Sequence, residues 1–317
     1  MKKIYCGIIL IGLCVFIPDA HAFWIWSPKT QEWKNPKYSA LASPYLQYKQ
    51  ALEYFEAGSY KEAYAEFRKL LTHYPDAKEA ADGQYYVGRT LEKLGKPYQA
   101  FEAYEKVIDR YPNSKRINEV VEHQYQIGEF FLNREGGEML GLSIYDFVQH
   151  PSIEIFKSIV EKVPYSELAP KAQYKLGLLY LELGRYEEAK DAFQKAIDNY
   201  PESEWAAPSK YQLAIATAKF SAGAEYDTSA VKQAADRLDE FIEAHPDAEI
   251  SESAQTRLRE LRNQEAKKAF DIAVFYEKQH KTEAARLYYA RVTEQFPESP
   301  YAERAQRKLQ QLNGQSE

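Results

Sequence analysis

Cysteine is almost absent from the chain: of 317 residues only Cys6 and Cys14 are cysteines, and both lie in the first 22 positions. Once that segment is removed, as argued below, the rest of the chain cannot form disulfides or use a thiol in catalysis. Long apolar runs are also scarce, since none after residue 17 approaches the roughly 20 residues that a membrane-spanning helix needs. We therefore expect no membrane-spanning helix beyond the N-terminal segment.

Motifs for catalysis and cofactor binding are missing as well. The six histidines are scattered, and no pair four residues apart lies beside a carboxylate, so no zinc site is predicted. The sequence contains no nucleophile elbow, no phosphate-binding glycine loop and no dinucleotide fingerprint. A formal net charge of −6 disfavours nucleic acid as a main partner. We expect a protein without enzyme activity, cofactor or metal.

The first 22 residues have the order of a secretory signal peptide. Two lysines precede an apolar run over residues 4–17, and the sequence AHA at 20–22 offers small residues for cleavage. Export with cleavage after Ala22 is therefore expected. Acylation of Cys14 is the alternative, but a lipoprotein signal has a small residue before its cysteine, and here that residue is Leu13.

Three of the four tryptophans follow this segment directly, at positions 24, 26 and 33. Their alternation and the nearby prolines predict an extended arm with turns over residues 23–43. Three indoles imply burial, and we favour burial against the first repeat unit, where they would cap its open end. Burial in a membrane interface, where tryptophan is favoured, is the alternative.

A repeat runs through the rest of the chain, and its clearest unit, residues 169–201, matches the tetratricopeptide pattern. Gly177 and Ala189 are small because two antiparallel helices approach closely there, and Phe193 fills the space beside them. Pro201 ends the second helix, because proline disfavours helical geometry in the residue before it. The pairs that mark unit ends are Tyr74-Pro75, Tyr111-Pro112, Val163-Pro164, Tyr200-Pro201, His245-Pro246 and Phe296-Pro297.

These repeats predict an all-α fold, a tetratricopeptide-repeat solenoid of about five to six helix-pair units. Units 1–3 are expected over residues 44–164, with an insertion over 133–151, and the C-terminal units and capping helices over 165–312. A further insertion is expected at 221–229, where a solenoid accepts one easily. The last segment is expected to form a long helix, a helix pair and a terminal helix, followed by a disordered tail at 313–317.

The order of these features resembles the BamD family, the tetratricopeptide subunits of the bacterial outer-membrane β-barrel assembly machinery. An export signal is followed by early repeats ending in HYPDAKEAADGQYYVG and RYPNSKRINEV, then by a large insertion in the third unit. The most specific part is the closing stretch LRNQEAKKAFDIAVFYEKQHKTEAARLYYARVTEQFP. The resemblance covers residues 44–312 and implies a non-catalytic periplasmic scaffold associated with the outer membrane.

The resemblance also implies partners: unfolded outer-membrane proteins for the N-terminal units and subunits of the assembly machinery for the C-terminal half. The family places an arginine and a glutamate in a linker helix, where this chain has Gln264 and Ala269, with Arg259 and Arg262 close by. Partner docking is thus expected at Arg259, Arg262 and Gln264. Membrane association would come through partners or through the tryptophan-rich arm. The alternative is an adaptor of a Tol-Pal or other cell-envelope complex.

A peptide-binding groove is expected along the first helices of the first two units, which line the inner face of a tetratricopeptide solenoid. The first unit contributes aromatic and apolar side chains, and the second adds charges, including an arginine suited to a peptide carboxylate. Packing of these side chains against the N-terminal arm is an equal alternative. The expected groove residues are Tyr45, Tyr48, Leu52, Phe55, Asp82, Tyr85, Arg89 and Glu92.

Overall fold

The computed structural model describes residues 24–27, 31–35, 39–133, 150–222 and 228–314. Several expectations lie outside the described residues: the signal peptide, nearly all of the first insertion, the middle of the second, and the last three residues of the tail. The chain forms two compact units, Met1–Leu94 and Gly95–Glu317, and each is described by itself. The domain boundary expected after residue 164 stays a prediction.

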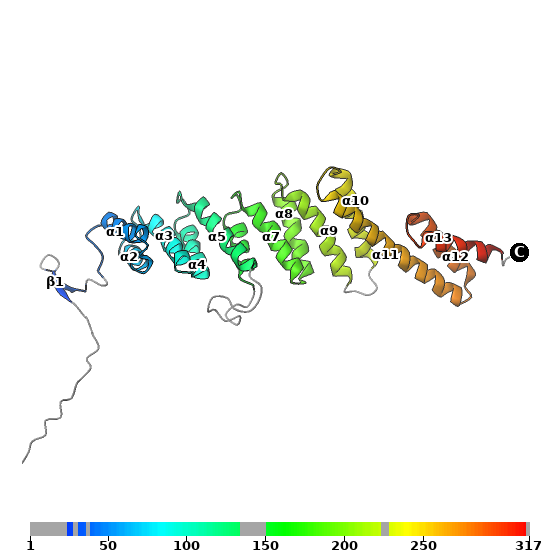
Figure 1. Ribbon diagram of the computed structural model, residues 1–317, viewed down its shortest axis with the longest axis horizontal. Coiled ribbons are helices and arrows are strands. Elements are labelled where there is room, and N and C mark those ends of the chain that lie inside the picture. Colours follow the sequence, from blue (N-terminus) through cyan, green and yellow to red (C-terminus); the bar gives the residue numbers. More distant parts are fainter. Residues whose placement is uncertain (1–23, 28–30, 36–38, 134–149, 223–227, 315–317) are drawn as a thin grey trace, which may run out of the picture. The chain divides into compact units, whose positions relative to one another are not determined.

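Unit 1 contains two short strands and three helices: β1 (Ile25–Ser27), β2 (Glu32–Lys34), α1 (Pro44–Glu56), α2 (Tyr60–His73) and α3 (Ala80–Lys93). Unit 2 contains the other described helices: α4 (Pro97–Arg110), α5 (Ile117–Leu132), α6 (Pro151–Lys162), α7 (Ala169–Glu182), α8 (Tyr186–Asn199), α9 (Ala206–Ala222), α10 (Thr228–Ala244), α11 (Ser251–Lys278), α12 (Thr282–Gln295) and α13 (Ala302–Gly314). Within each unit, helices that follow one another in sequence pack side by side (Figure 1). The predicted all-α tetratricopeptide fold is confirmed. Among the described residues, five helix pairs pack within a unit: α1–α2, α5–α6, α7–α8, α9–α10 and α11–α12.

The proline turns recur with nearly the same geometry, as predicted. The residue before the proline has φ −136° and ψ 52° at Tyr74, and φ −134° and ψ 52° at Tyr200. This backbone is outside the helical region because the proline ring excludes it. In each case the carbonyl of this residue accepts a hydrogen bond from the N–H three positions on, for example from Ser203 to Tyr200 at 3.0 Å. The same short turn therefore links successive pairs.

Glycine ends the first helix of several units, also as predicted. Gly58 and Gly184 have φ of 76° and 70°, a left-handed conformation that glycine adopts without the penalty of a side chain. His280 occupies the corresponding turn between α11 and α12 with φ 58°. A histidine there costs backbone strain, and the turn forms all the same because both flanking helices are held by their packing.

The C-terminal segment differs from the expectation. The residues expected to form a long helix and then the first helix of a pair form one continuous helix, α11. The reason is that no glycine or proline occurs between Ser251 and Lys278, so nothing in the sequence ends the helix. Asn313 and Gly314 belong to α13, so they are helical rather than part of a tail.

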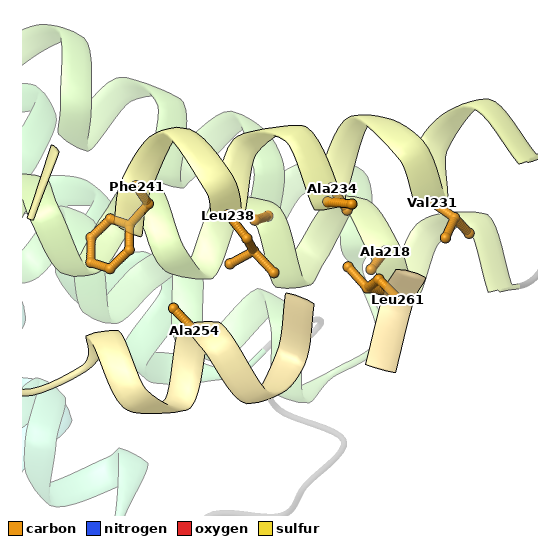
Figure 2. Packing of buried hydrophobic residues seen from close by; sticks show 9 residues of the cluster. Ala218, Val231, Ala234, Leu238, Phe241, Ala254 and Leu261 are labelled. Carbon is orange, nitrogen blue, oxygen red and sulfur yellow. The ribbon is translucent and has the colours of Figure 1, made fainter. Parts of the chain in front are cut away.

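Helix α11 takes part in two successive cores. Its first half packs on α9 and α10 through Ala254 and Leu261, which meet Leu238 in an apolar cluster (Figure 2). Its second half contributes Ala269 and Phe270 to a separate cluster with α12 and α13. The middle of α11, between these clusters, carries the expected docking residues.

A buried glutamine recurs in helices α1, α3, α5 and α7, the first helices of four repeats. The sequence analysis did not predict this feature. The Nε2 of Gln173 donates to the carbonyl of Ala192 at 2.9 Å, and that of Gln124 donates to the Glu105 carboxylate at 2.6 Å. Gln173 thus links α7 to α8, and Gln124 links α5 to α4, so both buried Nε2 donors are satisfied where burial would otherwise be costly, whereas the buried Oε1 of Gln124 has no hydrogen-bond partner among the described residues. The members are Gln47, Gln84, Gln124 and Gln173, each four positions before the small residue of its helix.

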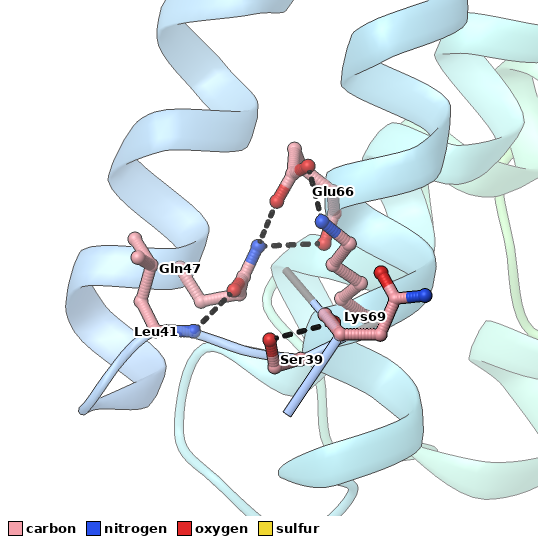
Figure 3. Close-up of polar contacts among 6 residues, drawn as sticks. Ser39, Leu41, Gln47, Glu66 and Lys69 are labelled. Atoms are coloured by element: carbon pink, nitrogen blue, oxygen red, sulfur yellow. Dashed lines mark hydrogen bonds and ion pairs between the residues drawn. The ribbon is translucent and has the colours of Figure 1, made fainter. Parts of the chain in front are cut away.

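The segment before α1 is fixed to unit 1 by polar contacts (Figure 3). Gln47 is fully buried; its Oε1 accepts from the backbone N–H of Leu41 at 2.8 Å, and its Nε2 donates to the Glu66 carboxylate at 2.6 Å. The hydroxyl of Tyr74 donates to the carbonyl of Leu41 at 2.5 Å. The C-terminal end of the arm is therefore attached to α1 and α2.

The tryptophans of the arm are not buried against the first repeat, so that expectation is wrong. Strands β1 and β2 pair antiparallel with Trp26 opposite Trp33, and these indoles touch edge to face with ring centroids 5.6 Å apart. Trp24, Trp26 and Trp33 are 55%, 45% and 63% exposed. Pairing of the arm with itself has replaced its packing on α1 and α2, because the alternating indoles face each other across the ribbon.

Candidate functional site

An aromatic surface joins α1 to α3 in unit 1 and contains two of the expected groove residues. The ring of Tyr86 lies 5.2 Å from Phe55 and 6.2 Å from Tyr48, between centroids, and stacks on Phe67 at 5.4 Å. Phe67 is fully buried, whereas Tyr48, Phe55 and Tyr86 are partly exposed. We call these three residues the aromatic ledge; its rings are held in place by the core beneath them.

The other expected residues of α1 extend this surface along the helix. Tyr45 is 58% exposed and Leu52 is half-buried. With Tyr48 and Phe55 they follow a spacing of three and four positions, which places them on one face of the helix. On this face Tyr45, at the start of α1, is an accessible aromatic residue, and Leu52, further along the helix, is a partly buried apolar residue.

The charged residues of α3 interact along their own helix. The Nη1 of Arg89 donates to the hydroxyl of Tyr85 at 2.8 Å, and its Nε lies 3.6 Å from the Glu92 carboxylate. Asp82 is half-buried and lies about one helical turn before Tyr85. The guanidinium is thus oriented before any ligand arrives, and an incoming carboxylate would compete with Glu92 for it.

Tyr85 differs from the other expected groove residues because its side chain is only 1% exposed. Its hydroxyl orients Arg89, so it supports the surface rather than presenting a ring to a ligand. The residue that presents its ring beside Phe55 is Tyr86, which the sequence analysis did not select. The sequence does show a second aromatic residue directly after Tyr85. The spacing of three and four positions that was used to choose the groove residues does not include it.

The expected docking residues lie at the middle of α11 in unit 2. Arg259 and Arg262 line a cavity of about 270 Å³ together with Asn263 and the turn after α12, residues 295–299. Gln264 is exposed on the same stretch of helix but does not line the cavity. The structure therefore brings two of the three residues into one concave site.

The two arginines of this cavity differ in their partners. Arg262 forms an ion pair with Asp239 of α10, which neutralises part of its charge. Arg259 is exposed, and its Nη2 donates to the hydroxyl of Thr256 at 3.3 Å. Arg259 is thus the more available cation for an acidic or carbonyl group of a partner.

Glu265 adds a perturbed carboxyl to this stretch of α11. Burial raises the pKa of this carboxyl above its ordinary value, and the nearby charge of Asp236 acts in the same direction. The positive charge of Arg262 opposes the shift without cancelling it. The charges of Lys232 on α10 and Arg291 on α12 also oppose the shift. Among the described residues, no three His, Cys, Asp or Glu side chains gather in a way that could hold a metal ion.

Family models match several parts of the sequence. The tetratricopeptide-repeat model matches residues 45–77, 82–114 and 171–203, which include the expected groove residues. The model of a family described as outer membrane lipoprotein matches residues 218–315, which include the cavity on α11. A comparison with curated proteins finds no match. In the part of the chain that the structure describes, no helix is long and apolar enough to cross a membrane.

Several solved structures are similar to this chain at low identity. The C-terminal part of a tetratricopeptide protein from Cytophaga hutchinsonii shares 18% identity, with 84% of this chain and 88% of that chain covered and a TM-score of 0.35. MamA from Desulfovibrio magneticus RS-1 shares 19% identity, with coverages of 65% and 97% and a TM-score of 0.32. A tetratricopeptide protein from Parabacteroides merdae shares 14% identity, with coverages of 85% and 98% and a TM-score of 0.32.

The two family models match different parts of the same chain. The repeats come first and the outer membrane lipoprotein match comes last, which is the order that the sequence predicts. Tetratricopeptide repeats occupy the N-terminal and middle parts, and the outer membrane lipoprotein family occupies the C-terminal part, from the end of α9 through α13. The chain is a tetratricopeptide-repeat protein whose residues 218–315 match the outer membrane lipoprotein family, and this combination supports the predicted resemblance to the BamD family.

Proposed function

We propose that this protein is a non-catalytic scaffold of the outer-membrane β-barrel assembly machinery, located in the periplasm at the outer membrane. One observation carries the proposal: the outer membrane lipoprotein family match, residues 218–315, falls on the helices that hold the α11 cavity. Tetratricopeptide repeats alone occur in many kinds of adaptor protein. The match of the C-terminal part favours a protein of the cell envelope. Scaffolds of this kind act by binding, which agrees with the missing catalytic motifs.

In this scaffold the N-terminal units bind clients. The aromatic ledge suits the aromatic side chains of an extended segment, because anchored rings lose little entropy on binding. Arg89, oriented by Tyr85, suits a carboxylate such as a chain terminus. We therefore expect unfolded outer-membrane proteins to bind here through segments that end in an aromatic residue.

The C-terminal half docks other subunits of the machinery. Arg259 and the cavity beside it offer a cation next to a concave surface of mixed polarity, the turn residue Phe296 included. Arginine is favoured in such interfaces because its planar group binds carboxylates and carbonyls in several directions. Gln264, exposed one turn further on, extends the same contact.

The second candidate is an adaptor of a Tol-Pal or other cell-envelope complex, which the repeats would also support. Purification of the tagged protein from detergent-extracted envelope separates the two. We expect a large β-barrel protein to co-purify, and recovery of Tol-Pal components alone would contradict the proposal.

A charge reversal at the cavity sharpens this experiment. Arg259→Glu should lower recovery of the barrel protein about tenfold or more, because a charged hydrogen bond in an interface is worth roughly 1.5–3 kcal/mol. Arg307→Glu is the matched control, since Arg307 is also exposed but lies on α13. Equal losses from both variants would show that the effect is not specific to the cavity.

A further inference from the structure

The hairpin β1–β2 presents an exposed aromatic face that the scaffold function does not use. Trp26 and Trp33 are directly opposite in the ribbon, so both side chains lie on one face. Trp24 lies directly before β1, two positions before Trp26. Three of the four tryptophans of the chain thus lie in or next to the hairpin, each about half exposed or more.

Covering this aromatic face, and so removing it from water, is energetically favourable. Each aromatic side chain of this size buries on the order of 150–250 Å² when it is covered. A two-stranded ribbon alone is marginally stable in water, so a surface that covers one face would also stabilise the hairpin.

The charge of the surrounding sequence indicates what covers the face. Residues 23–38 contain three lysines and one glutamate, although the chain as a whole has a net charge of −6. Anionic lipid headgroups attract such a local excess of lysine. Tryptophan is the side chain most typical of membrane interfaces, where its ring lies in the apolar boundary and its N–H reaches polar groups.

We propose that the hairpin, through Trp24, Trp26 and Trp33, binds the interface of a lipid bilayer that contains anionic lipids. The segment after the hairpin is attached to α1 by the hydrogen bond between Leu41 and Gln47 (Figure 3), and to the end of α2 by the bond from the Tyr74 hydroxyl to the Leu41 carbonyl. Hairpin binding therefore holds unit 1 close to the membrane surface. This contact needs neither a lipid on Cys14 nor a partner protein, so it stands apart from the scaffold proposal.

Fluorescence of the arm tests this proposal. The fourth tryptophan, Trp205, lies in unit 2, so Trp205→Phe leaves emission from the arm alone. The chain is used without residues 1–22, so that the apolar run and any lipid on Cys14 cannot bind vesicles. On vesicles of phosphatidylcholine and phosphatidylglycerol we expect a blue shift, quenching by brominated lipid chains, and weaker binding on phosphatidylcholine alone.

Removal of two indoles supplies the decisive comparison. Trp26→Ser with Trp33→Ser should lower the partition coefficient at least about tenfold, because the apolar area that enters the interface is lost. Tyr165→Ser with Phe275→Ser is the matched control, since these aromatic residues are 100% and 58% exposed in unit 2. Melting temperatures verify that all variants fold.

Three results would overturn the proposal. The first is an emission spectrum that vesicles of neither composition change. The second is an equal loss of binding in the hairpin variant and the control variant. The third is protection of the indoles by an envelope protein without any vesicle binding, which would make the covering partner a protein.

Discussion

Replacing Gly177 with alanine should destabilise the protein by about 2 kcal/mol, within the usual range for overpacking of a core. A Cβ at this position would lie 2.5 Å from Cε1 and 2.7 Å from Cδ1 of Phe193, a ring with no exposed surface. Glycine to alanine inside a helix normally stabilises by roughly 0.5–1 kcal/mol. A loss of stability would therefore show that close approach of α7 and α8, and not helix propensity, determines the residue here.

A double-mutant cycle with Phe193→Ala isolates this contact. Phe193→Ala alone should cost about 3–5 kcal/mol, because it leaves a cavity in the core. In the presence of Gly177→Ala its cost should be smaller by 1 kcal/mol or more, roughly the coupling of two residues in contact, because the added methyl then occupies freed space. Urea denaturation followed by circular dichroism measures all four proteins.

Gly184→Ala is the control for this cycle. Gly184 has φ 70°, and nothing lies within 4 Å of a Cβ built there. Its substitution should cost about 1 kcal/mol through backbone strain alone, with no coupling to Phe193→Ala. If Gly177→Ala proves stabilising, or as uncoupled as Gly184→Ala, the packing described for this helix pair is wrong.

Client binding should depend strongly on the aromatic ledge and Arg89. Tyr48→Ala combined with Arg89→Ala should weaken binding of a peptide with the C-terminal sequence of an outer-membrane β-barrel protein by tenfold or more. The estimate follows from loss of a charge-assisted hydrogen bond, worth about 1.5–3 kcal/mol, together with an aromatic anchor. Isothermal calorimetry or fluorescence anisotropy with a labelled peptide measures the change.

Helix α2, which lies in the same compact unit as Arg89, offers a matched control. Arg68 lies over the ring of Tyr64 at 6.0 Å, and its Nη1 is 3.4 Å from the Tyr64 hydroxyl, much as Arg89 lies beside Tyr85. Tyr64→Ala with Arg68→Ala should leave peptide binding unchanged. Because Tyr48 also touches Phe67, Arg89→Lys is measured separately with the core intact. Unaltered binding in both groove variants would refute the groove assignment.

The repeat was predictable from sequence because its signals are local. A proline fixes the backbone of the residue before it, so the ends of α2 and α8 follow from Pro75 and Pro201 alone. The small residue at Gly177 and the large one at Phe193 likewise belong to one unit. Each feature depends on neighbours within a single helix pair, where spacing in sequence corresponds to distance in space.

The features that were missed depend on partners that sequence spacing does not identify. Tyr86 lies next to Tyr85 in sequence, yet it is the residue that reaches Phe55 and Tyr48 of α1. The indoles of the arm were expected on the first repeat, but Trp33 pairs with Trp26 instead. In both cases several aromatic partners were available, and only the geometry of the chain selects among them.

Site-specific photocrosslinking in the cell envelope tests the scaffold assignment most directly. A photoreactive residue is placed at Gln264 of α11 and, as a matched control, at Gln99, an exposed glutamine of α4. We expect Gln264 to crosslink to a large β-barrel protein of the outer membrane and Gln99 not to do so. Crosslinks from Gln264 only to Tol-Pal or other envelope components would contradict the scaffold assignment.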